Sequence, residues 1–382
     1  MPVAWTDIDF QIGEGGLLRR FETVAHLTRA GRQILTAVLV TWVPVMALGL
    51  ISEHAFGHRE PILHHAATHV RLLVAAPMFL LIDAMFSRGC RVILAQLVFK
   101  NFIPEAAEAS FQRILRSATR LSNSWVPEGL LMLLSIGLGI AALFGLVPAS
   151  GVIGHGRRTP AELWYALTDW PFVQFLLWRS LWRWMIWMRI LFGLSRIPLA
   201  LVATHPDRRA GISFLRLPSV GYCAFLLFAV ASILCAEWGD RLTLSSSFGG
   251  FAPLLALFAG VGGLIAFGPL LAFAPQLYRA RRQGIIDCGG RACDEGRRFQ
   301  RRVAQTRAVD DPAAAIEVSA LCDVGVVYRE AVDRLQIVLV DRRDVFALLL
   351  ATLLPVLPVM LFRVPLEDWR SLAGMLTGGL VQ

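Results

Sequence analysis

The chain has 382 residues, of which 56% are hydrophobic and only 17% are charged, and its mean hydropathy is +0.58. Soluble domains carry about 25% charged residues, so this composition excludes an ordinary soluble protein and indicates a membrane protein. The net charge of +9 would suggest nucleic acid in a soluble chain, but basic loops of membrane proteins fix orientation and meet anionic lipid. The lipid bilayer, and not nucleic acid, is therefore the expected partner.

Seven apolar stretches are predicted to cross the membrane as helices, because each approaches the roughly 20 residues that span the hydrocarbon. They lie near residues 34–53, 70–86, 126–148, 171–193, 219–237, 252–275 and 344–363. The second stretch is the shortest and has polar flanks. The predicted fold class is an all-α membrane protein, a bundle of about seven transmembrane helices with a small cytoplasmic helical subdomain.

Arginine and lysine are distributed unevenly between the loops. With the amino terminus inside, the inner segments hold 27 of these residues and the outer segments hold 7. Since basic residues are enriched in cytoplasmic loops, the pattern predicts a bacterial inner-membrane protein with a cytoplasmic amino terminus. An odd number of crossings then puts the carboxyl terminus in the periplasm.

Three regions follow from this topology: a membrane bundle over 1–275, a basic cytoplasmic segment over 276–343, and the last span with an outer interfacial tail over 344–382. Within the first region, the inner loop 88–125 has an amphipathic helical pattern. One face carries Phe111, Ile114, Leu115, Ala118 and Leu121, and the other carries Arg113, Arg116 and Arg120. We expect this helix to lie along the membrane surface.

The 276–343 segment begins with a basic run from Arg279 to Arg307. A helix start is predicted at Asp310-Asp311-Pro312, and apolar residues follow at helical spacing. About 65 residues are too few for a confident independent core, so we expect the segment to pack on the membrane bundle.

Basic side chains within the 171–193 stretch are the most informative candidates for a site. Arg179 and Arg183 are one turn apart and share a face. An arginine within the bilayer costs about 2.5 to 3.5 kcal/mol on insertion scales and normally meets a partner or water. By helix depth, Asp83 is the expected partner of these two, and Glu128 is expected to serve Arg189. The cluster is either an anion-binding or gating site, or a buried ion pair that fixes helix packing.

The first outer loop concentrates histidines, with His58, His65 and His69 as candidate metal ligands. His65 and His69 have the i, i+4 spacing that allows two imidazoles to share one metal ion. Ordinary solvated loop histidines are the alternative. The six cysteines show no disulfide framework, and Cys288 and Cys293 have no second pair at zinc spacing.

The inner loop after the fourth span contains His205-Pro206-Asp207 followed by Arg208. The tripeptide is also found in chaperone co-factor J-domains, which require soluble helices on both sides, whereas here the flanks are predicted to cross the membrane. The alternative is a capped turn in which Asp207 and Thr204 bond to nearby backbone.

Motifs for nucleotide binding, acyl transfer or zinc-dependent hydrolysis do not occur in the sequence. Their absence argues against an enzyme, and no cofactor is expected. The expected function is channel-like or transporter-like handling of an anion, or a subunit of a membrane complex with a membrane-protein partner or a second copy. The alternative is a metal-dependent membrane enzyme that uses the outer histidines.

Three runs, Trp178–Leu215, His69–Pro77 and Leu321–Glu367, carry a resemblance. They are similar to an uncharacterised family of bacterial multi-pass inner-membrane proteins. The resemblance implies the same membrane topology over nearly the whole chain and brings no activity.

Overall fold

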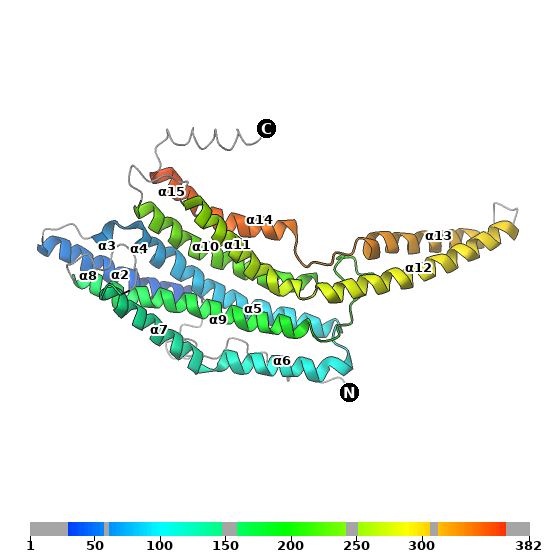
Figure 1. Ribbon diagram of the computed structural model, residues 1–382, viewed down its shortest axis with the longest axis horizontal. Helices are drawn as coiled ribbons and strands as arrows, with labels where there is room; N and C mark the ends of the chain where they lie inside the picture. The colour runs from blue at the N-terminus through cyan, green and yellow to red at the C-terminus, as the bar shows by residue number, and fades with distance from the viewer. Residues whose placement is uncertain (1–29, 57–60, 147–158, 242–250, 306–311, 364–382) are drawn as a thin grey trace.

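The computed structural model describes residues 30–56, 61–146, 159–241, 251–305 and 312–363, and the regular elements in these ranges are all helices. Most run side by side along the long axis of the molecule and form a bundle (Figure 1). The bundle helices are α2 (Ala30–Phe56), α5 (Ala76–Phe99), α7 (Trp125–Leu143), α9 (Trp170–Leu194), α10 (Arg216–Arg241), α11 (Phe251–Leu271), α14 (Arg342–Leu353) and α15 (Val356–Arg363). The all-α membrane bundle predicted from the sequence is confirmed.

By length and hydropathy, six helical segments of the described chain are able to cross a membrane. They are Gly31–Ala55, Ala66–Phe99, Trp125–Leu143, Ser213–Arg241, Phe251–Leu271 and Arg342–Met360. The predicted span 171–193 corresponds to α9, whose arginines and tryptophans lower its hydropathy. It nevertheless packs against α5 and α7 within the bundle, and the count of seven crossings stays a prediction.

Several short elements connect or extend the bundle helices. At the end of the bundle away from α12, they are α3 (Pro61–His64), α4 (Ala66–Val70), η2 (Arg71–Ala75), α8 (Pro160–Trp164) and η3 (Tyr165–Asp169). The elements α4, η2 and α5 form one continuous helix from Ala66 to Phe99. The weakest predicted span is therefore part of a 34-residue helix, which extends well beyond 70–86 at its carboxyl end.

Helix α6 (Glu105–Asn123) confirms the amphipathic pattern. It runs lengthwise beside the carboxyl-terminal part of α9, and the two helices pack together (Figure 1). Phe111 and Leu115 are buried, and Ile114 fills the space over Gly193. The apolar stripe of α6 therefore covers a neighbouring helix, and its placement relative to the membrane surface stays a prediction.

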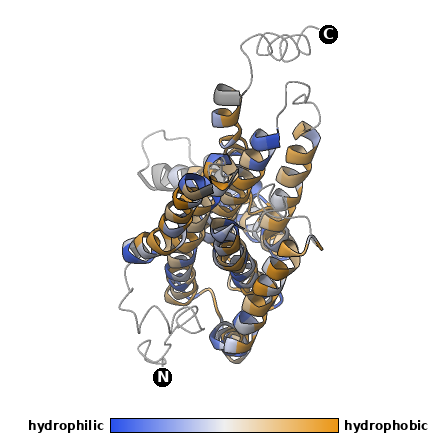
Figure 2. Cartoon of the chain, turned by 90° about the vertical axis from the view of Figure 1, so that its left-hand side faces the viewer, coloured by the Kyte–Doolittle hydropathy of each residue, from blue (hydrophilic) through white to orange (hydrophobic). Residues whose placement is uncertain are grey.

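The bundle helices consist largely of apolar residues (Figure 2), and many of these are exposed. Large side chains such as Leu133 and Leu264, 68% and 70% exposed, point away from the molecule. A water-soluble protein rarely exposes such contiguous apolar surface. Lipid contact is the physical reason for it.

The largest apolar core surrounds α9. Trp184 and Trp187 are fully buried, and Tyr222 of α10 stacks on Trp184 with ring centroids 5.6 Å apart. Two polar contacts fix this layer, because the Tyr222 hydroxyl donates to the Ser180 carbonyl and the Trp187 indole donates to Ser219. These tryptophans therefore serve packing.

Helix α12 (Ala274–Gln305) leaves the bundle and forms a long hairpin with α13 (Pro312–Val327), followed by η6 (Tyr328–Asp333) (Figure 1). We call Ile285–Val327 the arm and the bundle end from which it projects the arm end. At 1.5 Å per residue, the 32 residues of α12 measure about 48 Å. Helix α13 begins at Pro312 as predicted, but the described part of the arm extends away from the bundle (Figure 1).

The arm is attached through the start of α12. The side-chain amide of Gln276 donates to the carbonyls of Ser195 and Ile197, both at 2.7 Å, immediately after α9 ends. Arg281 donates to the Asp333 carbonyl. The predicted outer tail 364–382 and the chain ends, on which the predicted sides of the termini depend, lie outside the described residues.

Candidate functional site

A charge cluster joins α5, α7 and α9 within the bundle. Arg179 and Arg183 project from one face of α9, where Asp83 and Ser87, also one turn apart, face them from α5. Arg179 bonds Asp83 through Nη1 at 2.6 Å and Glu128 of α7 through Nε at 3.0 Å. Arg183 forms an ion pair with the other Asp83 oxygen and bonds Ser87 at 3.2 Å. The predicted pairing of both arginines with Asp83 is therefore present.

The cluster is electrically balanced, since two guanidiniums meet two carboxylates. Both arginines are almost fully buried, so their attraction to Asp83 and Glu128 offsets a large loss of hydration. One hydrogen-bond donor of the cluster is unused, because Arg179 Nη2 is buried without a hydrogen-bond partner. The cavity beside Arg183 measures about 10 Å³, the size of one water molecule.

Glu128 and Arg189 do not pair as the sequence suggested. Glu128 accepts from Arg179, whereas Arg189 is exposed and donates to Ser117 of α6 at 3.5 Å. Counting residues along a helix gives depth but not direction, and Arg189 points toward α6. Glu128 lies three residues, about 4.5 Å, from the start of α7, whereas Asp83 and Arg179 lie well inside the helix Ala66–Phe99 and α9.

The candidate metal ligands of the first loop are occupied by protein groups. Trp42 donates its indole N–H to Nδ1 of His69 at 3.2 Å, and Nε2 of His69 contacts the Leu63 carbonyl at 3.0 Å. His65 lies 3.4 Å from Asp240. His58 lies outside the described residues, and within them no group of three possible ligands forms around a common point.

Polar residues with no signal in the sequence connect the helices close to the first-loop histidines. Arg71 donates to the Tyr165 hydroxyl at 2.7 Å and to Glu237 at 2.9 Å. Asp240 of α10 accepts the backbone N–H groups of Ala66 and Ala67, and so caps α4 from another helix. Sequence spacing holds no signal for such a cap.

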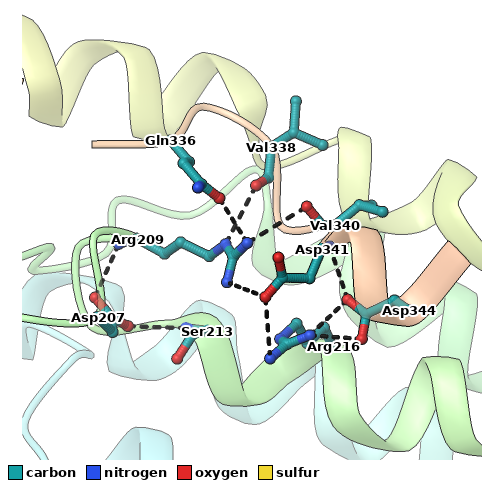
Figure 3. A network of polar contacts seen from close by, with 9 residues as sticks. All are labelled: Asp207, Arg209, Ser213, Arg216, Gln336, Val338, Val340, Asp341 and Asp344. Atoms are coloured by element: carbon teal, nitrogen blue, oxygen red, sulfur yellow. Dashed lines mark hydrogen bonds and ion pairs between the residues drawn. The ribbon is translucent and has the colours of Figure 1, made fainter. Parts of the chain in front are cut away.

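The His205-Pro206-Asp207 loop is a tightly bonded turn in front of η4 (Ser213–Leu215) (Figure 3). The Asp207 carboxylate accepts backbone N–H groups from Arg209, Gly211 and Ser213 at 2.9 to 3.2 Å. Burial raises the pKa of Asp207, but these hydrogen bonds outweigh it and bring the pKa below its ordinary value. The capped turn is the better interpretation, because the Asp207 side chain is used within its own loop.

The backbone of this turn requires Gly211. Arg208, Ala210 and Gly211 all have positive φ, with 89° at Gly211. A Cβ atom at Gly211 would come within 2.5 Å of the Phe102 ring, so a side chain is excluded by both conformation and space.

Arg209, and not the predicted Arg208, is the arginine that the loop buries. It donates to the Gln336 side chain at 2.6 Å and to the Val338 and Val340 carbonyls at 3.4 Å (Figure 3). The Arg208 side chain is exposed, while its backbone carbonyl accepts from the Gln336 N–H at 2.8 Å. The loop therefore fastens the segment that returns from the arm.

A second arginine completes this fastening at the start of α14. Arg216 bonds both oxygens of Asp344 at 2.5 and 2.6 Å, and Asp341 lies 3.7 Å from both Arg209 and Arg216 (Figure 3). Asp341 and Asp344 also form a capping box at the amino end of α14. The Asp-x-x-Asp spacing before an apolar run was a readable signal for that cap.

Taken together, the structure brings Asp83, Glu128, Arg179 and Arg183 into one cluster and leaves Arg189, His205 and Asp207 in other surroundings. The cluster balances charge and fixes three helices, and the loop network fastens the base of the arm. Comparison of the chain with protein-family models, curated proteins and solved structures found no match.

Proposed function

We propose that the protein is a membrane-anchored subunit of a complex, and that it holds an acidic protein partner with its arm on the cytoplasmic side of a bacterial inner membrane. The membrane bundle is the anchor and the arm is the docking element. Arginine enrichment at the arm end supports the cytoplasmic orientation, because basic residues concentrate on that side.

One observation carries this proposal: the described side chains of the arm form no buried layer of their own. From Ile285 to Arg301, and at the described side chains of 319–329, every residue is at least partly exposed. Ile286 and Val326 are 58% and 49% exposed. Two helices that bury so little apolar surface gain little stability from each other. A partner that covers them would supply the missing contacts.

The charge of the arm indicates the chemistry of that partner. Helix α12 contains eight arginines and three carboxylates, a net charge of +5. Arg291, Arg297 and Arg301 have no carboxylate partner among the described residues, which favours an acidic surface. Asp287, Asp294 and Glu295 interrupt the basic helix, and Pro312–Asp333 carries a net charge of −3 with four carboxylates and one arginine. Those carboxylates would repel nucleic acid, so a protein fits better.

Handling of an anion by the buried arginines is a second candidate, favoured by the unpartnered Nη2 of Arg179. The two carboxylates that neutralise Arg179 and Arg183 weaken it. A metal-dependent enzyme has less support, since protein groups occupy both ring nitrogens of His69.

Photo-crosslinking in native membranes tests the docking proposal. A photoreactive residue at Ile286 or Val326 should form one discrete crosslinked product with another protein, and the same residue at lipid-facing Leu133 should not. Arg291→Glu combined with Arg297→Glu should abolish that product, because it reverses two charges on the docking surface. A product formed only between differently tagged copies of this chain, or products unaffected by the charge reversal, would overturn the proposal.

A further inference from the structure

Four arginines form a surface at the arm end that is separate from both the buried cluster and the arm. Arg113, Arg116 and Arg120 follow one exposed stripe of α6, and Arg189 of α9 reaches the same stripe through its hydrogen bond to Ser117. The three α6 arginines, with Ser117 and Leu121, line an open hollow of about 340 Å³. We call these four residues the arginine face.

The arginine face lacks carboxylates. Arg113 donates to Ser110, and Arg116 bonds the backbone and side-chain oxygens of Gln112. Within the described ranges, none of the four forms an ion pair with Asp or Glu. By contrast, Arg209 and Arg216 at the same end of the bundle are paired with Asp341 and Asp344. Four uncompensated guanidiniums present a site for an anionic group from outside the chain.

The position of the face along the bundle identifies the source of that group. Helix α7 begins at Trp125, which is 59% exposed and is followed by exposed Val126 and Leu130. An exposed tryptophan at the start of an apolar helix marks the membrane interface. Arg120 and Arg116 precede Trp125 by five and nine residues, near the end of α6 that meets α7 at the extended residue Ser124.

The arginine nearest to Trp125, Arg120, lies within reach of the headgroup layer. The polar zone extends about 5 to 8 Å beyond the hydrocarbon on each side, and an arginine side chain extends several ångströms further along the membrane normal. Arg189 bonds Ser117, between Arg116 and Arg120 in the stripe, so it lies at the same level. Free phosphate would not require this alignment, whereas lipid phosphates are fixed at this depth.

We infer that the arginine face binds the phosphate headgroup of an anionic phospholipid at the arm end of the bundle. Guanidinium groups suit this ligand because they bond phosphate oxygens in pairs. The inference is independent of the docking proposal, since it uses none of the arm.

Lipid titration of the purified protein in detergent tests the inference. We expect dioctanoyl phosphatidylglycerol to raise the melting temperature, and dioctanoyl phosphatidylcholine and inorganic phosphate at equal concentration to raise it much less. The triple change Arg116→Gln, Arg120→Gln and Arg189→Gln should weaken the apparent phosphatidylglycerol affinity by about 100-fold, or about 5-fold per arginine, as expected for about 1 kcal/mol per basic residue.

A charge-matched control separates this site from general attraction. Arg279→Gln, Arg282→Gln and Arg329→Gln remove the same charge from exposed positions near the base of the arm and should leave the titration unchanged. Lysine at positions 116, 120 and 189 should keep more than half of the thermal shift. Equal weakening in the test and control variants would overturn the site. A full shift from inorganic phosphate alone would overturn the lipid as its ligand.

Discussion

The Asp83 carboxylate lies between Arg179 and Arg183, with one oxygen directed to each guanidinium. Removing Asp83 leaves two buried arginines with only Glu128, whereas removing Arg183 leaves Arg179 with two carboxylates. We expect Asp83→Leu and Arg183→Leu each to lower the free energy of unfolding, by up to about 3 to 5 kcal/mol as for broken pairs in soluble cores.

The double variant Asp83→Leu/Arg183→Leu retains the neutral pair Arg179–Glu128, so it should be more stable than the sum of the single losses predicts. Thermal and denaturant unfolding in detergent measure this difference. Ser87→Ala removes only the 3.2 Å bond to Arg183 and should cost about 1 kcal/mol. Strict additivity of the two leucine changes would show that Asp83 and Arg183 do not interact.

Arg209 and Arg208 offer a matched pair of adjacent arginines. Arg209→Gln should destabilise the protein by about 2 to 3 kcal/mol, because the buried guanidinium bonds three groups of the segment before α14. Arg208→Gln should change stability by less than about 0.5 kcal/mol, since that side chain is exposed.

Hydrogen exchange at the Gln336 amide gives a local measurement of the same contact. That amide bonds the Arg208 carbonyl, and it should exchange faster in Arg209→Gln than in the wild-type protein or in Arg208→Gln. Equal exchange in all three proteins would mean that Arg209 does not fasten this segment.

The pKa of Asp207 is lowered in the folded protein, so its ionised form contributes stability that is present above the unfolded pKa of about 3.9. This contribution is lost as the pH falls through the still lower folded pKa. The stability difference between wild type and Asp207→Asn should therefore be constant from pH 5 to 8 and shrink below about pH 4. Unfolding measured from pH 3 to 8 checks this, and a difference that vanished near neutral pH would contradict it.

His69 serves structure rather than metal binding in the described contacts. His69→Phe removes the bonds to Trp42 and Leu63, and should lower the melting temperature even with EDTA present. His64→Ala is the control, because His64 has only a 3.9 Å contact with the partly exposed Glu53. If zinc stabilised the wild type but not a variant that lacks His65 and His69, the metal-site hypothesis would be supported instead.

Sequence reasoning succeeded where the signal was local or depended on depth alone. Periodicity predicted α6, and residue counting along the helices paired Asp83 with the arginines of α9. It failed for Glu128 and Arg189, because depth does not fix the direction in which a side chain points. Periodicity also gave no sign that the apolar stripe of α6 packs on α9, since a helix and a lipid surface can bury the same stripe.

Contacts between distant segments had no sequence signal. Arg209 and Gln336 are 127 positions apart, and neither residue type marks a buried bond. Arg208 and Arg209 are chemically identical, and the turn, with positive φ at Arg208 and Ala210, directs Arg209 inward. The exposure of the described side chains of the arm was equally hidden, because the apolar spacing of α13 resembles that of a packed helix.

The two hydrogen bonds from the Gln276 side chain to the Ser195 and Ile197 carbonyls, just after α9, have a mechanical consequence. They fix the start of α12 to the end of α9, the helix that carries Arg179 and Arg183, so this point can act as a pivot for the arm. A rotation of about 5° at this point would move the far end of the 48 Å helix by roughly 4 Å. Conversely, a load on the arm would be delivered as torque to the end of α9, so that Gln276 transmits force between the arm and the membrane bundle.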